Sequence, residues 1–374
     1  MARRRGGALP RPMRARVVFV AVATLLAAPS ARASSPSPPA AIGGASGFHL
    51  MSPGQWLALC RGQAAGEEAV FPDLPAPSID VEPQARIPDV RMVDPAAAGV
   101  ELGNRNARLT AAYLAGTGVA GYALWWKGQD LGSFRSWSEG WFGEGTYAGG
   151  ADKASHFVMG YVFGRLFEGG YEKVGNEEAS ARWLSVGAVA ASAVLVELGD
   201  GYTSFRFSWE DALITTLGGA AGAAIEAAGL DDTLGFRFGW LPKSVPSDPS
   251  VTTAERDHYS DEIYTLDARM AGLLPRLGVE EPGLGRLFLA SLTYATKGYG
   301  WVEEPYRQRQ VGLEVGLDLP ELLRAVGLKE DRWWQRALLT VLRYLRLPYT
   351  AIGVRYDLNS GRFHGPDTGD SFRF

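Results

Sequence analysis

Ionisable side chains in the middle of this chain are spaced for acid–base or metal chemistry. Asp152 and His156 are four residues apart, so they share one face of a helix, and Lys153 lies beside Asp152. An aspartate one turn from an imidazole can fix its tautomer, raise its basicity or share a metal with it. We therefore predict His156, Asp152 and Lys153 as catalytic candidates. The structural alternative makes Asp152 a helix N-cap and His156 a core residue.

Further acidic groups follow at one-turn spacing. Glu197 and Asp200 are three residues apart near a predicted helix end, where the negative end of the helix dipole disfavours them, so they need a cation as a partner. Ser208 and Asp211 fit a capping box, which favours a structural role. One histidine with several carboxylates suits a hard or borderline cation, although no cofactor is identified. The predicted metal candidates are His156, Glu197 and Asp211, and the predicted polar cluster is Glu197, Asp200, Ser208, Asp211 and Arg165.

The elements that position these residues are predicted to be apolar helices rich in small residues. Four helices are expected, at about residues 109–126, 152–168, 181–198 and 209–228, with Gly218, Gly219 and Gly222 at close-packing positions. An amphipathic fifth helix is predicted at 251–274. After Pro282, partial alternation predicts strands at 288–294, 311–319 and 349–358, with helical pieces at 320–326 and 333–345.

The fold class is therefore mainly α: a bundle of about four helices with a smaller mixed α/β C-terminal part. Residues 1–33 have the basic, apolar and small-residue regions of a signal peptide. Residues 34–104 are rich in proline and alanine and are predicted to be a linker. The helical bundle domain is predicted at 105–275 and the mixed region at 283–374.

Composition limits the classes of partner. The first 33 residues hold seven arginines and no acid, so their removal moves the formal charge from −4 to −11. A mature chain this acidic argues against nucleic acid as a partner. Cys60 is the sole cysteine in the sequence, which excludes an intrachain disulfide and a thiolate zinc cluster. Whether Cys60 is modified is left open.

The ionisable residues also carry a resemblance to a known family. The pattern resembles the YfiM-like family of predicted periplasmic lipoproteins, a domain of unknown function, over about residues 104–366, and is more distantly similar to VanZ-like membrane proteins. Two departures are present: Thr215 stands where such sequences often have asparagine, and no suitable lipidation cysteine lies near the cleavage site. The matching positions are Asp152, Lys153, His156, Glu197, Asp200, Ser208 and Asp211.

Three hypotheses about function remain. The first is an uncharacterised protein of the periplasm or outer membrane, exported as the resemblance implies, that is associated with a membrane or lipid and whose polar site binds an envelope lipid or glycan. The second is a metal-assisted hydrolase or transferase acting on an envelope lipid or glycan, with His156 as general base. The third is a polytopic, VanZ-like protein of the inner membrane. Whether the protein is an enzyme is not decided by the sequence.

Overall fold

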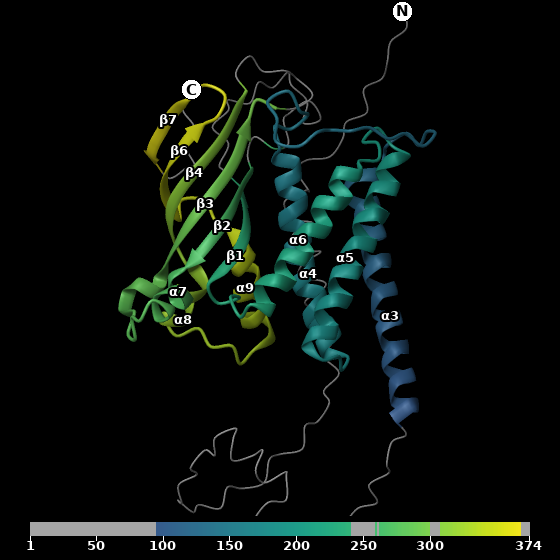
Figure 1. Cartoon of the computed structure of the whole chain (residues 1–374), viewed down its shortest axis with the longest axis horizontal. Coiled ribbons are helices and arrows are strands. Elements are labelled where there is room, and N and C mark those ends of the chain that lie inside the picture. Colours follow the sequence, from purple (N-terminus) through teal and green to yellow (C-terminus); the bar gives the residue numbers. More distant parts are fainter. Residues whose placement is uncertain (1–94, 241–258, 260–261, 300–306, 368–374) are drawn as a thin grey trace, which may run out of the picture. The chain divides into compact units, whose positions relative to one another are not determined.

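The computed structural model describes residues 95–240, 259, 262–299 and 307–367 (Figure 1). All of these residues belong to one compact unit. The predicted signal peptide and Cys60 lie outside the described residues, as does most of the predicted linker. The last ten linker residues, 95–104, are described and are helical, because the alanine-rich segment is compatible with the helix that follows it.

Four long helices form in the region where four were predicted. Helix α4 contacts both α5 and α6, and α3 contacts α5. Among the described residues, α5 alone is long and apolar enough to cross a membrane by length and composition, a test that core helices of soluble proteins also pass. The helices are α3 (Pro95–Gly121), extended by a π-helical segment (Tyr122–Trp126), α4 (Ala151–Lys173), α5 (Glu178–Gly201) and α6 (Trp209–Ala227).

Glycines bring α4 and α6 into backbone contact. A Cβ added to Gly160 would lie 1.9 Å from the Thr215 carbonyl oxygen, and one added to Gly218 would lie 1.9 Å from the Phe157 carbonyl oxygen. Real side chains do not tolerate such distances, so only glycine fits at either position. This confirms the close-packing interpretation of Gly218, and it fixes the helix pair that carries His156 and Asp211.

A seven-stranded sheet accompanies the helices, so the mainly α prediction is only partly confirmed. The described residues form seven α-helices and this mixed sheet, in the order β5-β1-β2-β3-β4-β6-β7. All neighbouring pairs are antiparallel except β1 and β5. The strands are β1 (Leu234–Trp240), β2 (Glu262–Arg269), β3 (Phe288–Lys297), β4 (Gln308–Leu317), β5 (Leu345–Arg346), β6 (Ala351–Asp357) and β7 (Arg362–Asp367).

Predictions for the C-terminal part are mostly confirmed. The three predicted strands correspond to β3, β4 and β6, and the predicted helical pieces correspond to α8 (Leu319–Ala325) and α9 (Trp333–Tyr344). Short helical segments also occur at α7 (Met270–Arg276) and Gly283–Leu287.

The predicted fifth helix, at 251–274, is wrong over residues 262–269, whereas residues 270–274 are helical and belong to α7. Residues 262–269 form β2, because Leu266 and Ala268 alternate with the buried Asp267 and Arg269 at the two-residue period of a strand. Residues 234–240 and 262–269 of the predicted helical domain therefore form strands, and the boundaries of that domain stay a prediction.

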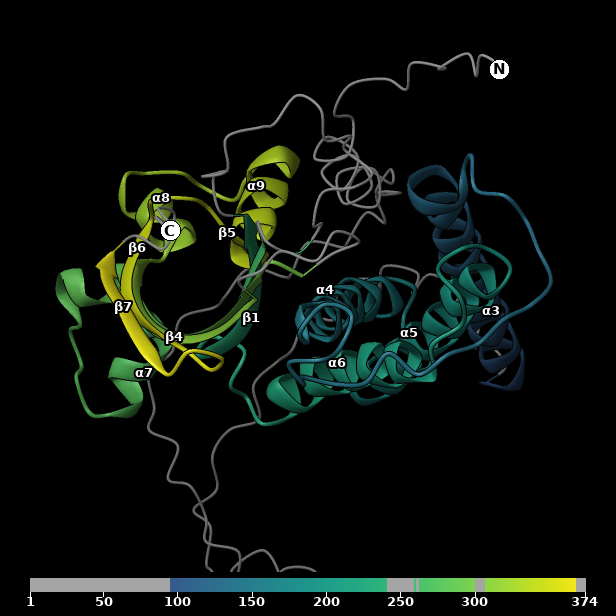
Figure 2. The same cartoon turned by 90° about the horizontal axis from the view of Figure 1, so that it is seen from above.

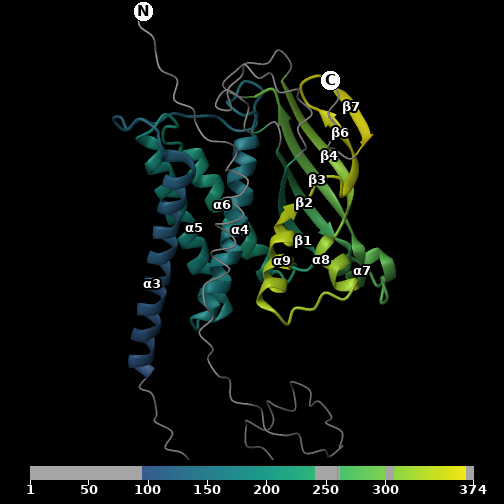
Figure 3. The same ribbon diagram turned by 180° about the vertical axis from the view of Figure 1, so that it is seen from behind.

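The sheet is strongly curved, as Figure 2 shows. Ion pairs are buried among the residues of its inward face: Arg237 pairs with Asp267, and Arg346 pairs with Glu314 at 2.8 Å. Helix α9 contacts β1 and β5, and the Arg343 carbonyl accepts a hydrogen bond from Arg269. Figure 3, a view from behind, shows α8 and α9 beside the sheet. Charged groups at this depth require such partners.

Candidate functional site

Lys153 is the centre of the polar cluster. Its side chain is 1% exposed, and its Nζ lies 2.6 Å from Glu139 Oε2, 2.8 Å from Asp152 Oδ2 and 2.5 Å from Asp211 Oδ1. Although burial alone disfavours the charged amine, Asp152, Asp211 and Glu139 raise the pKa of Lys153. The lysine is therefore a buried ammonium that holds three carboxyl groups together.

The start of α4 positions the first two residues of this cluster. Gly149 and Gly150 have positive φ angles of 62° and 96°, a conformation that glycine adopts without strain, and the helix begins at Ala151. Gly150 occupies the N-cap, so the predicted alternative of Asp152 as the N-cap is wrong. Asp152 instead lies in the first turn, where the positive end of the helix dipole favours a carboxylate.

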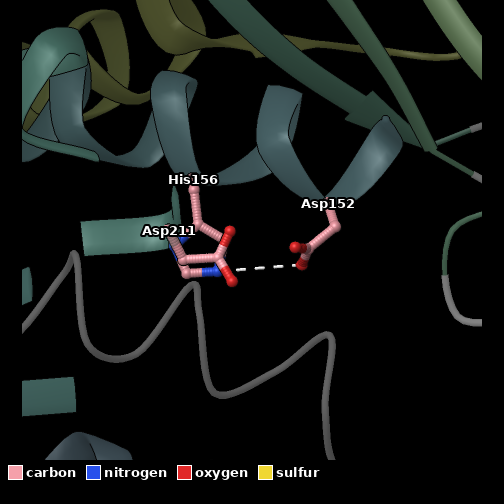
Figure 4. A group of neighbouring side chains, drawn as sticks. All are labelled: Asp152, His156 and Asp211. Carbon is pink, nitrogen blue, oxygen red and sulfur yellow. Dashed lines mark ion pairs between the residues drawn. The ribbon is translucent and has the colours of Figure 1, made fainter. Parts of the chain in front are cut away.

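His156 lies one turn further along α4 and faces Asp211 of α6 (Figure 4). Its Nε2 is 3.7 Å from Asp152 Oδ1, and its Nδ1 is 3.0 Å from the Thr215 hydroxyl oxygen. Each of Asp152, His156 and Asp211 offers a ligand atom, and these atoms all lie within 4.8 Å of one another. We call these three residues the cation centre.

The carboxyl groups around Lys153 differ strongly in acidity. Burial, followed by repulsion from Asp152 and Asp211, raises the pKa of Glu139 to about 9. Burial acts in the same direction on Asp152, but His156 and Lys153 overcome it and lower the pKa of that carboxyl. The Tyr259 hydroxyl also donates a hydrogen bond to Asp152 Oδ1. Two carboxyl groups on one ammonium therefore take opposite protonation states near neutral pH.

Glu197 has a structural contact instead of a place in the cation centre. Its Oε2 accepts a hydrogen bond of 3.0 Å from the Ser208 backbone N–H, and the Ser208 hydroxyl caps α6 by accepting from the Asp211 N–H at 3.4 Å. Ser208 is confirmed as the N-cap of α6, but the predicted capping box is only half formed, because the Ser208 N–H donates to Glu197 and not to Asp211. Burial and the nearby Asp211 raise the pKa of Glu197 to about 9. Glu197 is thus protonated at neutral pH and is a weaker metal candidate than Asp152.

Replacing Glu197 with glutamine is expected to flatten the dependence of stability on pH. The ordinary pKa of this group is 4.5, so between pH 4.5 and about 9 the folded chain holds a proton that the unfolded chain releases. The free energy of unfolding therefore falls as pH rises through that window, by on the order of 3 kcal/mol for one such group by pH 7. Glutamine has no proton to lose and removes this contribution.

Urea unfolding at several pH values, from about 5.5 to about 8.5, measures the effect. This range lies between the ordinary pKa and the raised pKa of Glu197. Glu178→Gln is the matched control, because Glu178 begins the same helix and its side chain is 78% exposed. Equal slopes for wild type and Glu197→Gln would contradict a proton held on Glu197.

Two predicted cluster members lie apart from Lys153. Asp200 accepts a hydrogen bond of 2.6 Å from Trp126 Nε1, and burial raises its pKa to about 6. Arg165 pairs with Glu168, with Glu226 and, at 3.3 Å, with Asp231. Arg165 therefore belongs to a second ionic cluster, and the prediction that groups it with Asp211 is not supported by these contacts.

Four residues that were not predicted as site residues contact members of the predicted cluster. Glu139 lies in the loop before α4, Tyr259 precedes β2, Trp126 ends the π-helical segment and Thr215 lies on α6. Glu139 also lines a small hollow with Trp141, Tyr147, Asp152 and Lys153. No periodic pattern marks a loop acid or a lone tyrosine. Thr215 had a signal, because it follows Asp211 by one helical turn and so shares its face.

Comparisons with known proteins cover the helices that carry the site. Residues 138–227 match a family model described as a predicted periplasmic lipoprotein, DUF2279. The match spans less than half of the chain. No curated protein and no solved structure matches. The YfiM-like and VanZ-like resemblances stay predictions. Over its site-bearing helices the chain is similar to the predicted periplasmic lipoproteins of unknown function, which supports an exported, periplasmic protein.

Proposed function

We propose that this exported protein binds a divalent cation at the cation centre. The observation that carries the proposal is the convergence of Asp152, His156 and Asp211 from two helices, with ligand atoms within 4.8 Å of one another. An imidazole and two carboxylates form a ligand set that suits borderline and hard divalent ions.

The charge of the surroundings supports this assignment. Glu139 and Glu197, with pKa values of about 9, hold their protons at pH 7, and burial raises the pKa of Asp211 too, whereas His156 and Lys153 lower the pKa of Asp152 and keep it a carboxylate. Lys153 uses Oδ2 of Asp152 and Oδ1 of Asp211. Each of these two carboxyl groups therefore keeps a second oxygen that can face a divalent ion, and a buried ion requires such partners.

The partners of His156 also fit a ligand role. A ring nitrogen that binds a metal is usually oriented by a hydrogen bond at the other nitrogen. Here Nδ1 contacts the Thr215 hydroxyl, and Nε2 is the nitrogen on the Asp152 side. Thr215 thus contacts the His156 imidazole from the position where the related sequences often have asparagine.

Removal of the cation is expected to destabilise the protein. Purified full-length chain should contain about one divalent ion, and dialysis against EDTA should lower its melting temperature by several degrees, because a ligand that binds only the folded chain stabilises it. Adding Mn²⁺ should restore the original value. A chain that contains no metal and melts identically with EDTA or Mn²⁺ would contradict the proposal and leave the cluster with a structural role alone.

A second candidate is metal-assisted hydrolysis or transfer on an envelope lipid or glycan. The opposite pKa shifts of Glu139 and Asp152 favour it, because such divergence separates an acid from a base. In this hypothesis His156 is the general base or a metal ligand. Metal-loaded protein that converts no component of an envelope lipid or glycan extract would remove this candidate and leave cation binding intact.

Association with the cell envelope belongs to the same proposal. The periplasmic family match supports it, whereas the polytopic inner-membrane alternative needs several spanning helices. Extraction with carbonate separates the two, because spanning helices resist release without detergent. Binding of an envelope lipid or glycan, and the absence of a nucleic acid partner, remain predictions.

A further inference from the structure

The sheet exposes aliphatic side chains on one face and buries charged ones on the other. On β4, Leu313 and Val315 are 65% and 54% exposed, whereas Glu314 between them is 4% exposed. On β6, Ile352 and Val354 are exposed and Arg355 is buried. This distribution is the reverse of that expected for an antiparallel sheet with one side in water.

The exposed side chains form two rows across neighbouring strands. Leu292 of β3 pairs with Leu313 of β4, which pairs with Val354 of β6. The second row joins Ala290, Val315 and Ile352 in the same way. None of the six carries a polar side chain, and we call them the outer apolar face: Ala290, Leu292, Leu313, Val315, Ile352 and Val354.

The first row continues onto a part of the sheet that is already covered. Leu292 pairs with Leu266 of β2, which pairs with Phe236 of β1. The Phe236 ring contacts Phe157 and Tyr161 of α4, with centroids 4.9 and 5.2 Å apart. One apolar surface therefore crosses the sheet, and α4 packs on it at β1, whereas Leu292 and Leu313 remain 53% and 65% exposed.

The inward face of the sheet carries charged side chains, and these side chains form ion pairs and hydrogen bonds with one another instead of with water. Asp267, which is fully buried, pairs with Arg237 and accepts a hydrogen bond of 2.6 Å from the Ser291 hydroxyl. Arg346 is also fully buried and pairs with Glu314. Because the ionic groups are compensated inside, the outer apolar face has no charge of its own and presents hydrocarbon alone.

We propose that the outer apolar face lies against the acyl chains of an envelope bilayer. A continuous exposed apolar patch marks an interaction surface. Protein interfaces are enriched in tyrosine, tryptophan and arginine and contain regular hydrogen bonds, and the six residues of this face supply none of these. Lipid acyl chains need no polar contacts, and this inference rests on the proposed association with the cell envelope, which places a bilayer within reach.

The test is flotation of the full-length exported chain with phosphatidylcholine vesicles, which carry no net charge. Leu313→Glu should weaken vesicle binding at least tenfold, because a carboxylate in the acyl region is costly. Val326→Glu is the matched control, since Val326 is 72% exposed and follows α8 instead of lying on this face. Both variants should melt as the wild type does, because both positions are exposed.

A spin label at Leu313→Cys, in a Cys60→Ser chain, gives an independent readout. With vesicles, the label should become accessible to oxygen and protected from a water-soluble nickel chelate. Equal vesicle binding by wild type and Leu313→Glu, or an unprotected label, would overturn the proposal. A label that is protected without vesicles would also overturn it, and would assign the face to a second copy if protection is lost on dilution, or to a segment of the same chain if it is not.

Discussion

Replacing Lys153 with methionine is expected to lower the free energy of unfolding by about 3–5 kcal/mol, the cost of breaking a buried ion pair by removing one partner. The Lys153 side chain is 1% exposed and lies within 2.8 Å of three carboxyl groups. Methionine fills a similar volume, so the loss comes from the carboxylates left buried without a cation. Chemical unfolding measures the change.

The control for this variant is Lys173→Met. Lys173 ends the same helix and is exposed, so its replacement should change the unfolding free energy by no more than about 0.5 kcal/mol. Adding Asp211→Asn to Lys153→Met should recover part of the loss, because one unpaired carboxylate is then removed. A loss below about 1 kcal/mol for Lys153→Met would contradict a structural ammonium.

Replacing His156 with alanine is expected to weaken the binding of Mn²⁺ by at least about 100-fold, because the loss of a residue that only supports a ligand already costs about 10–100-fold. His156 supplies one of the three converging ligand atoms and does not contact Lys153, and its side chain is 28% exposed. The variant should therefore fold as the wild type does. Calorimetric titration of metal-free protein gives the affinity.

Asp200→Asn is the control for the binding experiment. Asp200 is held by Trp126 and is not among the three residues of the cation centre. Its replacement should leave the affinity for Mn²⁺ within about threefold of wild type, a difference below 1 kcal/mol. Equal affinities for wild type and His156→Ala would place any bound ion elsewhere.

Much of the helical part could be predicted from sequence because its signals are local. The pattern of small residues gave α4, α5 and α6, and the capping role of Ser208 follows from its distance to Asp211. The helix predicted over β2 failed for a physical reason. Its aromatic and charged residues fit both periods, and pairing with β1 and β3 selects the strand.

The site could be predicted only in part, because some of its contacts join residues that lie far apart in the sequence. Asp152 and His156 share a helix face in the sequence, and helix packing at Gly160 and Gly218 adds Asp211. Glu139 reaches Lys153 from a loop, and Tyr259 reaches Asp152 from 107 residues away. Such contacts depend on tertiary structure and have no spacing rule. Burial also depends on tertiary structure. It raises the pKa of Glu197 and so makes this predicted metal candidate a weaker ligand than Asp152.

Anomalous diffraction from a crystal of the protein with Mn²⁺ tests the central claim most directly. We expect one peak within about 2.5 Å of His156 Nε2 and of carboxylate oxygens of Asp152 and Asp211, the range of metal–ligand bonds. A second acidic group, formed by Glu168, Glu172 and Glu226, should stay without Mn²⁺, because Arg165 pairs with two of its members. A peak at that second group alone, or none at His156, would contradict a cation bound by Asp152, His156 and Asp211.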